Sequence, residues 1–167
     1  MPLPELKKSF AAPIASALKP RGFCKQGMNF RALRPEAELI INIQSSRDST
    51  ADSLKVTVNL GIILNSIHEH FSSLNRAVWT AEWRQRIGHY IPGCSGDYWW
   101  ICESDQEAAR AGAEIANVLE KKALPEMEHL ALTSNLVAYW RSGQGGGLTP
   151  PAVQERLNYL DRIGTVP

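Results

Sequence analysis

An alternation of apolar and polar residues over positions 54–64 constrains the fold more than any other feature of this sequence. Apolar side chains occupy every second position from Leu54 to Leu64, and Lys55, Thr57 and Asn59 stand between them. Successive side chains of a β-strand point to opposite faces. The pattern therefore predicts a strand of a sheet with one face in a core and the other face polar.

Four shorter stretches are also typical of strands, because they alternate or are rich in aromatic and β-branched residues. They cover 23–25, 28–33, 38–45 and 98–102. Short polar connections between the successive strands favour an antiparallel meander over parallel crossover units. In this arrangement the polar face displays Arg31, Asn42, Gln44, Thr57 and Asn59.

Helical spacing and capping residues predict helices on both sides of the strand region. The first covers 4–19, and Pro13 is expected to kink or shorten it. Capping boxes, in which a serine precedes a glutamate by three residues, predict a short helix at 67–74 and a long helix at 105–122. Further helical pieces are expected at 125–132, at 135–140 after an interruption at 133–134, and from Pro150 behind a Thr149 cap. Residues 77–89 form either a short helix or an ordered loop.

These elements predict an α+β fold. We expect an antiparallel sheet of about five strands, packed on one face by the N-terminal helix and the long central helix, with C-terminal helices closing an edge. A length of 167 residues is enough for one self-sufficient core, and we expect a single domain over 1–167. The glycine-rich stretch 143–147 is expected to be a flexible, linker-like loop.

Composition favours a reduced, cytoplasmic protein. Three cysteines cannot all pair internally, and no apolar run approaches the length of about 20 residues that spans a membrane. Lys7 and Lys8 precede an apolar stretch, as in a signal peptide. However, Pro13 interrupts that stretch, and its apolar residues follow the four-residue spacing of an amphipathic helix, so we favour the helix.

The formal net charge of +1 hides a polarised distribution. Residues 1–35 hold seven basic side chains and one acidic side chain, a net +6, whereas 97–128 hold eight acidic and three basic ones, a net −5. These regions either face a partner or attract each other within the fold. The overall balance argues against binding nucleic acid by bulk charge.

No pattern of catalytic or metal-ligating residues is strong, and we expect no catalytic residues, metal or cofactor. His68 and His70 would point about 200° apart on a helix, and the three cysteines lack the spacing of structural zinc sites. We expect ordinary surface histidines and buried thiols. A Cys94 nucleophile with His89 nearby lacks an evident orienting group. No Lys-Ser/Thr pair follows the glycines at 143–147, as a phosphate loop requires.

Several short motifs together resemble the bacterial domain-of-unknown-function family 4304. They are Leu-Lys-Pro-Arg-Gly-Phe at 18–23, Asn-Phe-Arg at 29–31, Ile-Gln-Ser-Ser at 43–46, Val-Asn-Leu-Gly at 58–61, Arg-Ile-Gly at 86–88, Asp-Tyr-Trp-Trp at 97–100 and Leu-Asn-Tyr-Leu at 157–160. The family has no established catalytic residues, so the resemblance implies no enzyme chemistry. Proteins of this kind often occur beside bacterial polymorphic toxins, which implies an immunity-type inhibitor as a role.

Tryptophan and arginine dominate many protein interfaces, and the chain has five tryptophans. Adjacent Trp99 and Trp100 on a strand must point to opposite faces, so one can enter the core while the other lies on the polar face. There it is either open to a partner or packed under a helix that covers this face. The candidate binding residues are Arg31, Asn42, Gln44, Thr57, Asn59, Trp83, Arg86, Trp99 and Trp100. We expect a non-enzymatic binding protein that uses these residues, the tryptophans of 79–100 and the acidic helix surface to occlude the active site of a protein partner, such as a toxin encoded nearby. The alternative is an enzyme or RNA-binding module acting at Arg31, Gln44, Asn59 and Trp100.

Overall fold

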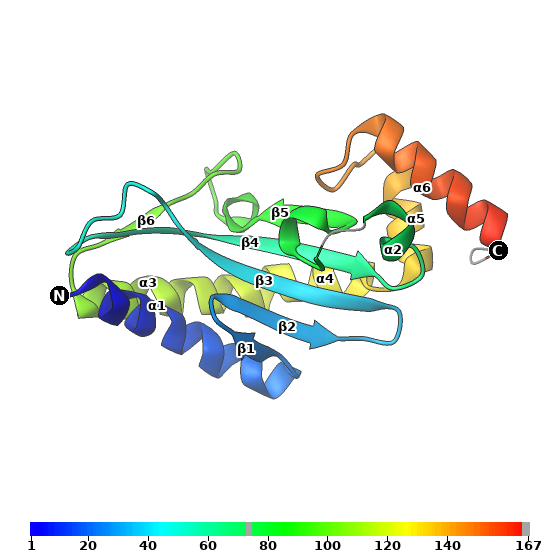
Figure 1. Cartoon of the computed structure of the whole chain (residues 1–167). Helices are drawn as coiled ribbons and strands as arrows, with labels where there is room; N and C mark the ends of the chain where they lie inside the picture. The colour runs from blue at the N-terminus through cyan, green and yellow to red at the C-terminus, as the bar shows by residue number, and fades with distance from the viewer. Residues whose placement is uncertain (73–74, 165–167) are drawn as a thin grey trace.

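A computed structural model of the chain describes residues 1–72 and 75–164 and contains a six-stranded antiparallel sheet (Figure 1). The strands are β1 (Cys24–Gln26), β2 (Asn29–Leu33), β3 (Ala37–Ser45), β4 (Leu54–Leu64), β5 (Trp83–Arg86) and β6 (Trp100–Cys102). β1 to β4 follow one another in space, and β5 and β6 share the free edge of β4. This arrangement confirms the predicted α+β class and the antiparallel meander.

Helices cover one face of the sheet, and the C-terminal helices lie at one end of it (Figure 1). They are α1 (Leu3–Leu18), α2 (His68–Phe71), α3 (Asp105–Val118), α4 (Leu124–Leu130), α5 (Thr133–Arg141) and α6 (Pro150–Ile163). A π-helical turn, Leu119–Ala123, joins α3 to α4. Pro125 lies just beyond this turn and has no N–H group to continue the regular helical hydrogen bonds.

α1 and α3 lie side by side beneath the sheet and enclose the main core with it (Figure 1). Gly112 permits their close contact, because a Cβ atom there would lie 2.1 Å from the Phe10 carbonyl oxygen. The alternating apolar residues of β4 all point into this core, as predicted. α1 continues through Pro13 without interruption, so the expected shortening of this helix is wrong.

The capping predictions had mixed outcomes. Ser104 caps α3 by accepting a hydrogen bond from the Glu107 amide, and Thr149 caps α6 in the same way. The predicted Ser66 capping box is wrong, since α2 begins after Ile67 with no side-chain cap. Part of the predicted 67–74 helix, residues 73–74, lies outside the described residues. α4 and α5 separate at 131–132, not at 133–134.

Residues 77–89 do not form a helix but contain β5 between two 3-10 turns, Val78–Thr80 and Ile87–Tyr90. Trp83 pairs with Ile62, and Arg86 pairs with Asn59. Gly61 makes room for the first turn, because a Cβ atom there would lie 3.1 Å from side chains of Val78 and Ala81. A four-residue strand is too short for alternation to identify it, so its partner β4 determines its structure.

The glycine-rich loop 143–147 is packed against β5. The Arg84 amide donates to the Gly146 carbonyl over 2.7 Å. Gly146 has a φ of 58°, and a Cβ atom there would lie 2.4 Å from the Trp83 indole. The prediction of a linker is therefore wrong, because the glycines let this loop follow the strand closely.

Among the described residues, no helix combines the length and the apolar character needed to cross a membrane.

Candidate functional site

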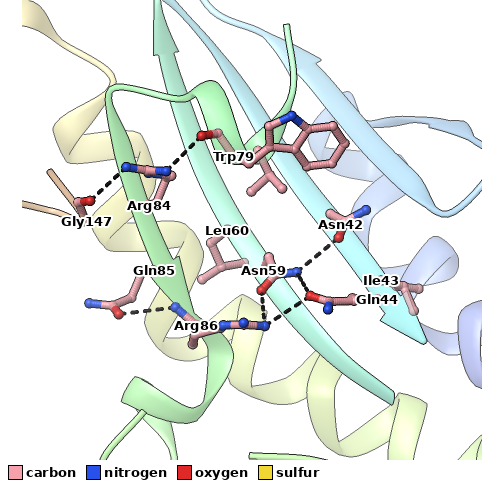
Figure 2. A pocket seen from close by; sticks show the side chains of 11 residues that line it. Asn42, Ile43, Gln44, Asn59, Leu60, Trp79, Arg84, Gln85, Arg86 and Gly147 are labelled. Carbon is pink, nitrogen blue, oxygen red and sulfur yellow. Dashed lines mark hydrogen bonds between the residues drawn. The ribbon is translucent and has the colours of Figure 1, made fainter. Parts of the chain in front are cut away.

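A groove of about 750 Å³ lies on the face of the sheet opposite α1 and α3. Strands β3, β4 and β5 form its floor, and the Val78–Thr80 turn and Gly147 border it (Figure 2). We call it the polar-face groove, and its polar and aromatic lining consists of Asn42, Gln44, Asn59, Trp79, Arg84, Gln85 and Arg86. The 3-10 turn packs Val78 and Ala81 on Ile40 and Ile63 of the same face, so this face is partly covered and partly open.

A row of directly paired residues crosses four strands on this face: Asn29, Asn42, Asn59 and Arg86, of which the last three line the groove. Asn42 Nδ2 donates to Asn29 Oδ1 over 2.9 Å, and Asn59 Nδ2 donates to Asn42 Oδ1 over 3.1 Å. Arg86 Nη1 completes the row by donating to Asn59 Oδ1 over 2.6 Å. We call these four residues the amide row.

Gln44 joins the amide row from the side. Its Oε1 atom accepts hydrogen bonds from Asn59 Nδ2 over 2.8 Å and from Arg86 Nη1 over 3.1 Å (Figure 2). Arg86 Nε also pairs with Asp97 Oδ1 over 3.1 Å at the exposed edge of the groove. The structure therefore brings together Asn42, Gln44, Asn59 and Arg86, which are four of the nine predicted binding residues.

Trp79 borders the groove with 65% of its surface exposed. Arg84 holds the backbone on which it stands, because Nη1 donates to the Trp79 carbonyl and Nη2 donates to the Gly147 carbonyl, both over 2.8 Å (Figure 2). Neither Arg84 nor Gly147 was among the predicted site residues. Their common function depends on a contact between segments 63 residues apart, which no local pattern indicates.

Arg31 lies on the polar face but is committed to an ion-pair cluster. Arg31 Nη1 and Arg76 Nε each lie 2.8 Å from the carboxylate of Glu38. Burial raises the pKa of the Glu38 carboxyl, but the hydrogen bonds and charges of the two arginines outweigh burial and hold that pKa below its usual value. This cluster fixes β3 to the segment that precedes the Val78–Thr80 turn.

The other predicted binding residues do not line the groove. Thr57 is completely buried, and its hydroxyl has no partner among the described residues. Trp83 and Trp100 point into the main core, because each occupies the core-facing side of its strand, and neither is available to a partner on the polar face. Trp99 is half-buried beside Lys55, whose Nζ lies 5.8 Å from the centre of the indole ring.

A second polar cluster lies in the interior and contains a histidine that we expected on the surface. His68 is buried, and its Nδ1 atom lies 2.9 Å from Glu82 Oε1. The other oxygen of Glu82 accepts from the Leu64 amide over 2.9 Å. Burial lowers the pKa of nearby Arg156, and the charge of Glu82 opposes this shift. The prediction of a surface position for His68 is therefore wrong, and we interpret this cluster as structural.

The cysteines are free, and only part of their predicted burial is observed: Cys102 is buried, Cys94 is half-buried and Cys24 is exposed. Among the residues that the structure describes, no three His, Cys, Asp or Glu side chains gather as metal ligands would. In the described part of the chain, one ion pair joins the basic region 1–35 to the acidic region 97–128: Arg34 pairs with Glu128 of α4 over 2.5 Å.

Comparison with known proteins identifies a family. A family model described as "Domain of unknown function (DUF4304)" matches residues 14–129, more than half of the chain. The match includes the amide row, Trp79 and Arg84, and it ends before Gly147 and α6. No curated protein and no solved structure matches the chain.

Proposed function

We propose that this chain, which belongs to the DUF4304 family, is a non-enzymatic protein that binds a protein partner in the polar-face groove. The observation that carries the proposal is the position of Trp79, a highly exposed indole at the border of the groove on a backbone that Arg84 holds in place. An exposed large aromatic side chain beside a concave polar surface is typical of an interface.

The surroundings of Trp79 favour binding. Tryptophan and arginine are the residues that most often dominate the energy of protein interfaces, and the groove places Trp79 beside Arg84 and Arg86. Both arginines are held by hydrogen bonds, so they lose little conformational freedom when a partner docks. The groove is thus a preorganised surface.

The chemistry of the described lining also supports binding over catalysis. Carboxamides, guanidinium groups and an indole line the groove. None of these groups is an ordinary nucleophile, and none exchanges protons near neutral pH as a general acid or base does. Hydrogen bonding and stacking are the interactions that such a surface offers.

In its specific form, the proposal is that the partner is a bacterial toxin and that docking occludes the toxin's active site. The experiment is co-expression with the products of neighbouring genes, followed by purification and a toxicity assay. We expect a one-to-one complex with one of these products and rescue from its toxicity. The absence of both complex and rescue for every neighbouring product would contradict the toxin-inhibitor proposal.

A matched pair of variants then tests the docking surface. Trp79→Ala removes the exposed indole of the groove, whereas Leu132→Ala removes an exposed apolar side chain outside the groove lining. We expect Trp79→Ala to weaken the complex by about tenfold or more and Leu132→Ala to leave it unchanged. Equal effects of the two substitutions would place the interface outside the groove.

A further inference from the structure

Arg86 determines the direction in which the amide row points its hydrogen bonds. A guanidinium group has donors and no acceptor. Arg86 therefore requires that Asn59 present its Oδ1 atom, as observed over 2.6 Å. Asn59 must then point its nitrogen toward Asn42 and Gln44, and Asn42 in turn points its nitrogen toward Asn29. Reversing any of these amides would place two donors in contact.

This direction leaves the row with surplus donors. Each carboxamide oxygen of Asn29, Asn42, Asn59 and Gln44 accepts a hydrogen bond from a neighbour. In contrast, the side-chain nitrogens of Asn29 and Gln44 donate to no group within 1–72 and 75–164. The side-chain nitrogen of Asn42 uses one of its two N–H bonds. A partner that forms hydrogen bonds to these unused N–H groups must therefore contribute acceptors.

The charge of the groove favours acceptors that are anionic. Arg84 contacts two carbonyl oxygens and forms no ion pair among the described residues, and the described lining of the groove contains no Asp or Glu. Arg86 already pairs with the carboxylate of Asp97 at the exposed edge. Hydrogen bonds between an arginine and a carboxylate are about twice as strong as neutral ones.

We infer that the partner inserts one or more Asp or Glu side chains into the polar-face groove, next to an apolar side chain that packs on Trp79. This inference rests on the proposed function and specifies the chemistry of the partner. The two arginines of the groove can hold one or two carboxylates, whereas binding to nucleic acid normally rests on many phosphate contacts. The observations therefore favour an acidic protein segment.

The test uses a fluorescent dodecapeptide that repeats glutamate, glycine and phenylalanine, together with a matched peptide in which glutamine replaces each glutamate. Fluorescence anisotropy measures the binding of each peptide to the full chain. We expect the acidic peptide to bind about tenfold or more tightly than the glutamine peptide. Increasing salt should reduce this difference, because salt screens exposed charges.

Two variants relate that difference to the amide row. In Arg86→Glu, an acceptor takes the place of the donor that orients the row. In Asn42→Asp, a carboxylate oxygen takes the place of the Asn42 side-chain nitrogen and removes its free donor. The Asn29 side chain can turn to donate to this oxygen. Each should weaken binding of the acidic peptide by about tenfold. The control is Arg110→Glu on the exposed side of α3, which changes the net charge as Arg86→Glu does and should leave binding unchanged.

The outcomes separate this inference from the proposed function. Equal binding of the two peptides, or binding of neither, overturns the acidic preference, whereas a co-expressed complex that depends on Trp79 still supports docking in the groove. An equal loss with Arg86→Glu and Arg110→Glu also overturns the inference, because it would reflect net charge alone. Preferential binding of a uridine-rich RNA with steep salt dependence would contradict both proposals.

Discussion

Arg86 on β5 donates a hydrogen bond to the carboxamide of Asn59 on β4 over 2.6 Å, and the two residues are direct partners in the strand register. This contact connects the edge strand to a hydrogen-bonded row that crosses four strands. The polar face of the sheet thus carries a continuous hydrogen-bonded network that connects neighbouring strands.

Trp79 should account for much of the tryptophan fluorescence that a solute can quench, because it is far more exposed than the buried Trp83, Trp100 and Trp140. We expect Trp79→Phe to reduce the acrylamide quenching constant clearly while changing the free energy of unfolding by no more than about 0.5 kcal/mol. Trp83→Phe serves as the buried control and should not reduce the quenching constant. An unchanged constant in Trp79→Phe would mean that the indole is covered in solution.

Gly146 and Gly27 provide a matched test of the packed glycine loop. Their φ angles are 58° and 60°, but a Cβ atom at Gly146 would lie 2.4 Å from the Trp83 ring, whereas one at Gly27 would meet nothing within 4 Å. We expect Gly27→Ala to cost about 1 kcal/mol of unfolding free energy, and Gly146→Ala to cost about 2 kcal/mol more, measured by urea denaturation. Equal losses would indicate that the loop does not pack on β5.

The fold was largely predictable from the sequence because its main strands alternate over long stretches. The eleven residues of β4 leave one choice of buried face, and each polar residue then falls on the opposite face by the two-residue period. This reasoning placed Asn42, Gln44 and Asn59 on one face. It could not show that they form hydrogen bonds with one another, because that depends on which residues pair across the strands.

The missing parts of the site depend on contacts between distant segments. Trp79 stands at the groove because Arg84 connects its backbone to Gly147, and the Glu82 side chain meets His68 across 14 residues of sequence. Trp83 was expected at the interface because of its residue type, but its position opposite Ile62 directs it into the core. Composition alone cannot assign a side chain of a short strand to a face.

Glu38 should make stability depend on acidic pH. The pKa of the Glu38 carboxyl is lowered in the folded protein, so the folded state binds fewer protons than the unfolded state at acidic pH. The resulting stabilisation is fully present above the pKa of the unfolded state. It is lost as pH falls through the pKa of the folded state. Urea denaturation should show a decreasing free energy of unfolding below about pH 4.5. Glu38→Gln should lose about 2 kcal/mol at neutral pH and show a shallower decrease.

A second carboxyl group, that of Glu36, should also contribute to the loss of stability at acidic pH. The pKa of Glu36 is also lowered, by hydrogen bonds from Thr133. A smaller acidic loss of stability should therefore remain in Glu38→Gln. A pH profile of Glu38→Gln that runs parallel to that of the unaltered protein would contradict the proposed contribution of the Arg31, Glu38 and Arg76 cluster.

Glu82 should be among the polar residues most important for stability. Replacement by Ala would leave the buried His68 ring and the Leu64 amide without their acceptor. We expect Glu82→Ala to lower the free energy of unfolding by about 3 kcal/mol, whereas Glu69→Ala, at an exposed position of α2, should change it by no more than about 0.5 kcal/mol. A small effect of Glu82→Ala would show that the cluster relaxes without cost.

A protein partner that docks in the polar-face groove must contact the side chains that line it. The most direct measurement follows the side-chain amide signals of Asn42 and Gln44 and the indole N–H signal of Trp79 by NMR while the co-expressed partner is added. We predict that these signals shift or broaden, whereas the backbone signal of Arg110 on α3 stays in place. A complex that forms while the three groove signals remain unchanged would contradict docking in the groove.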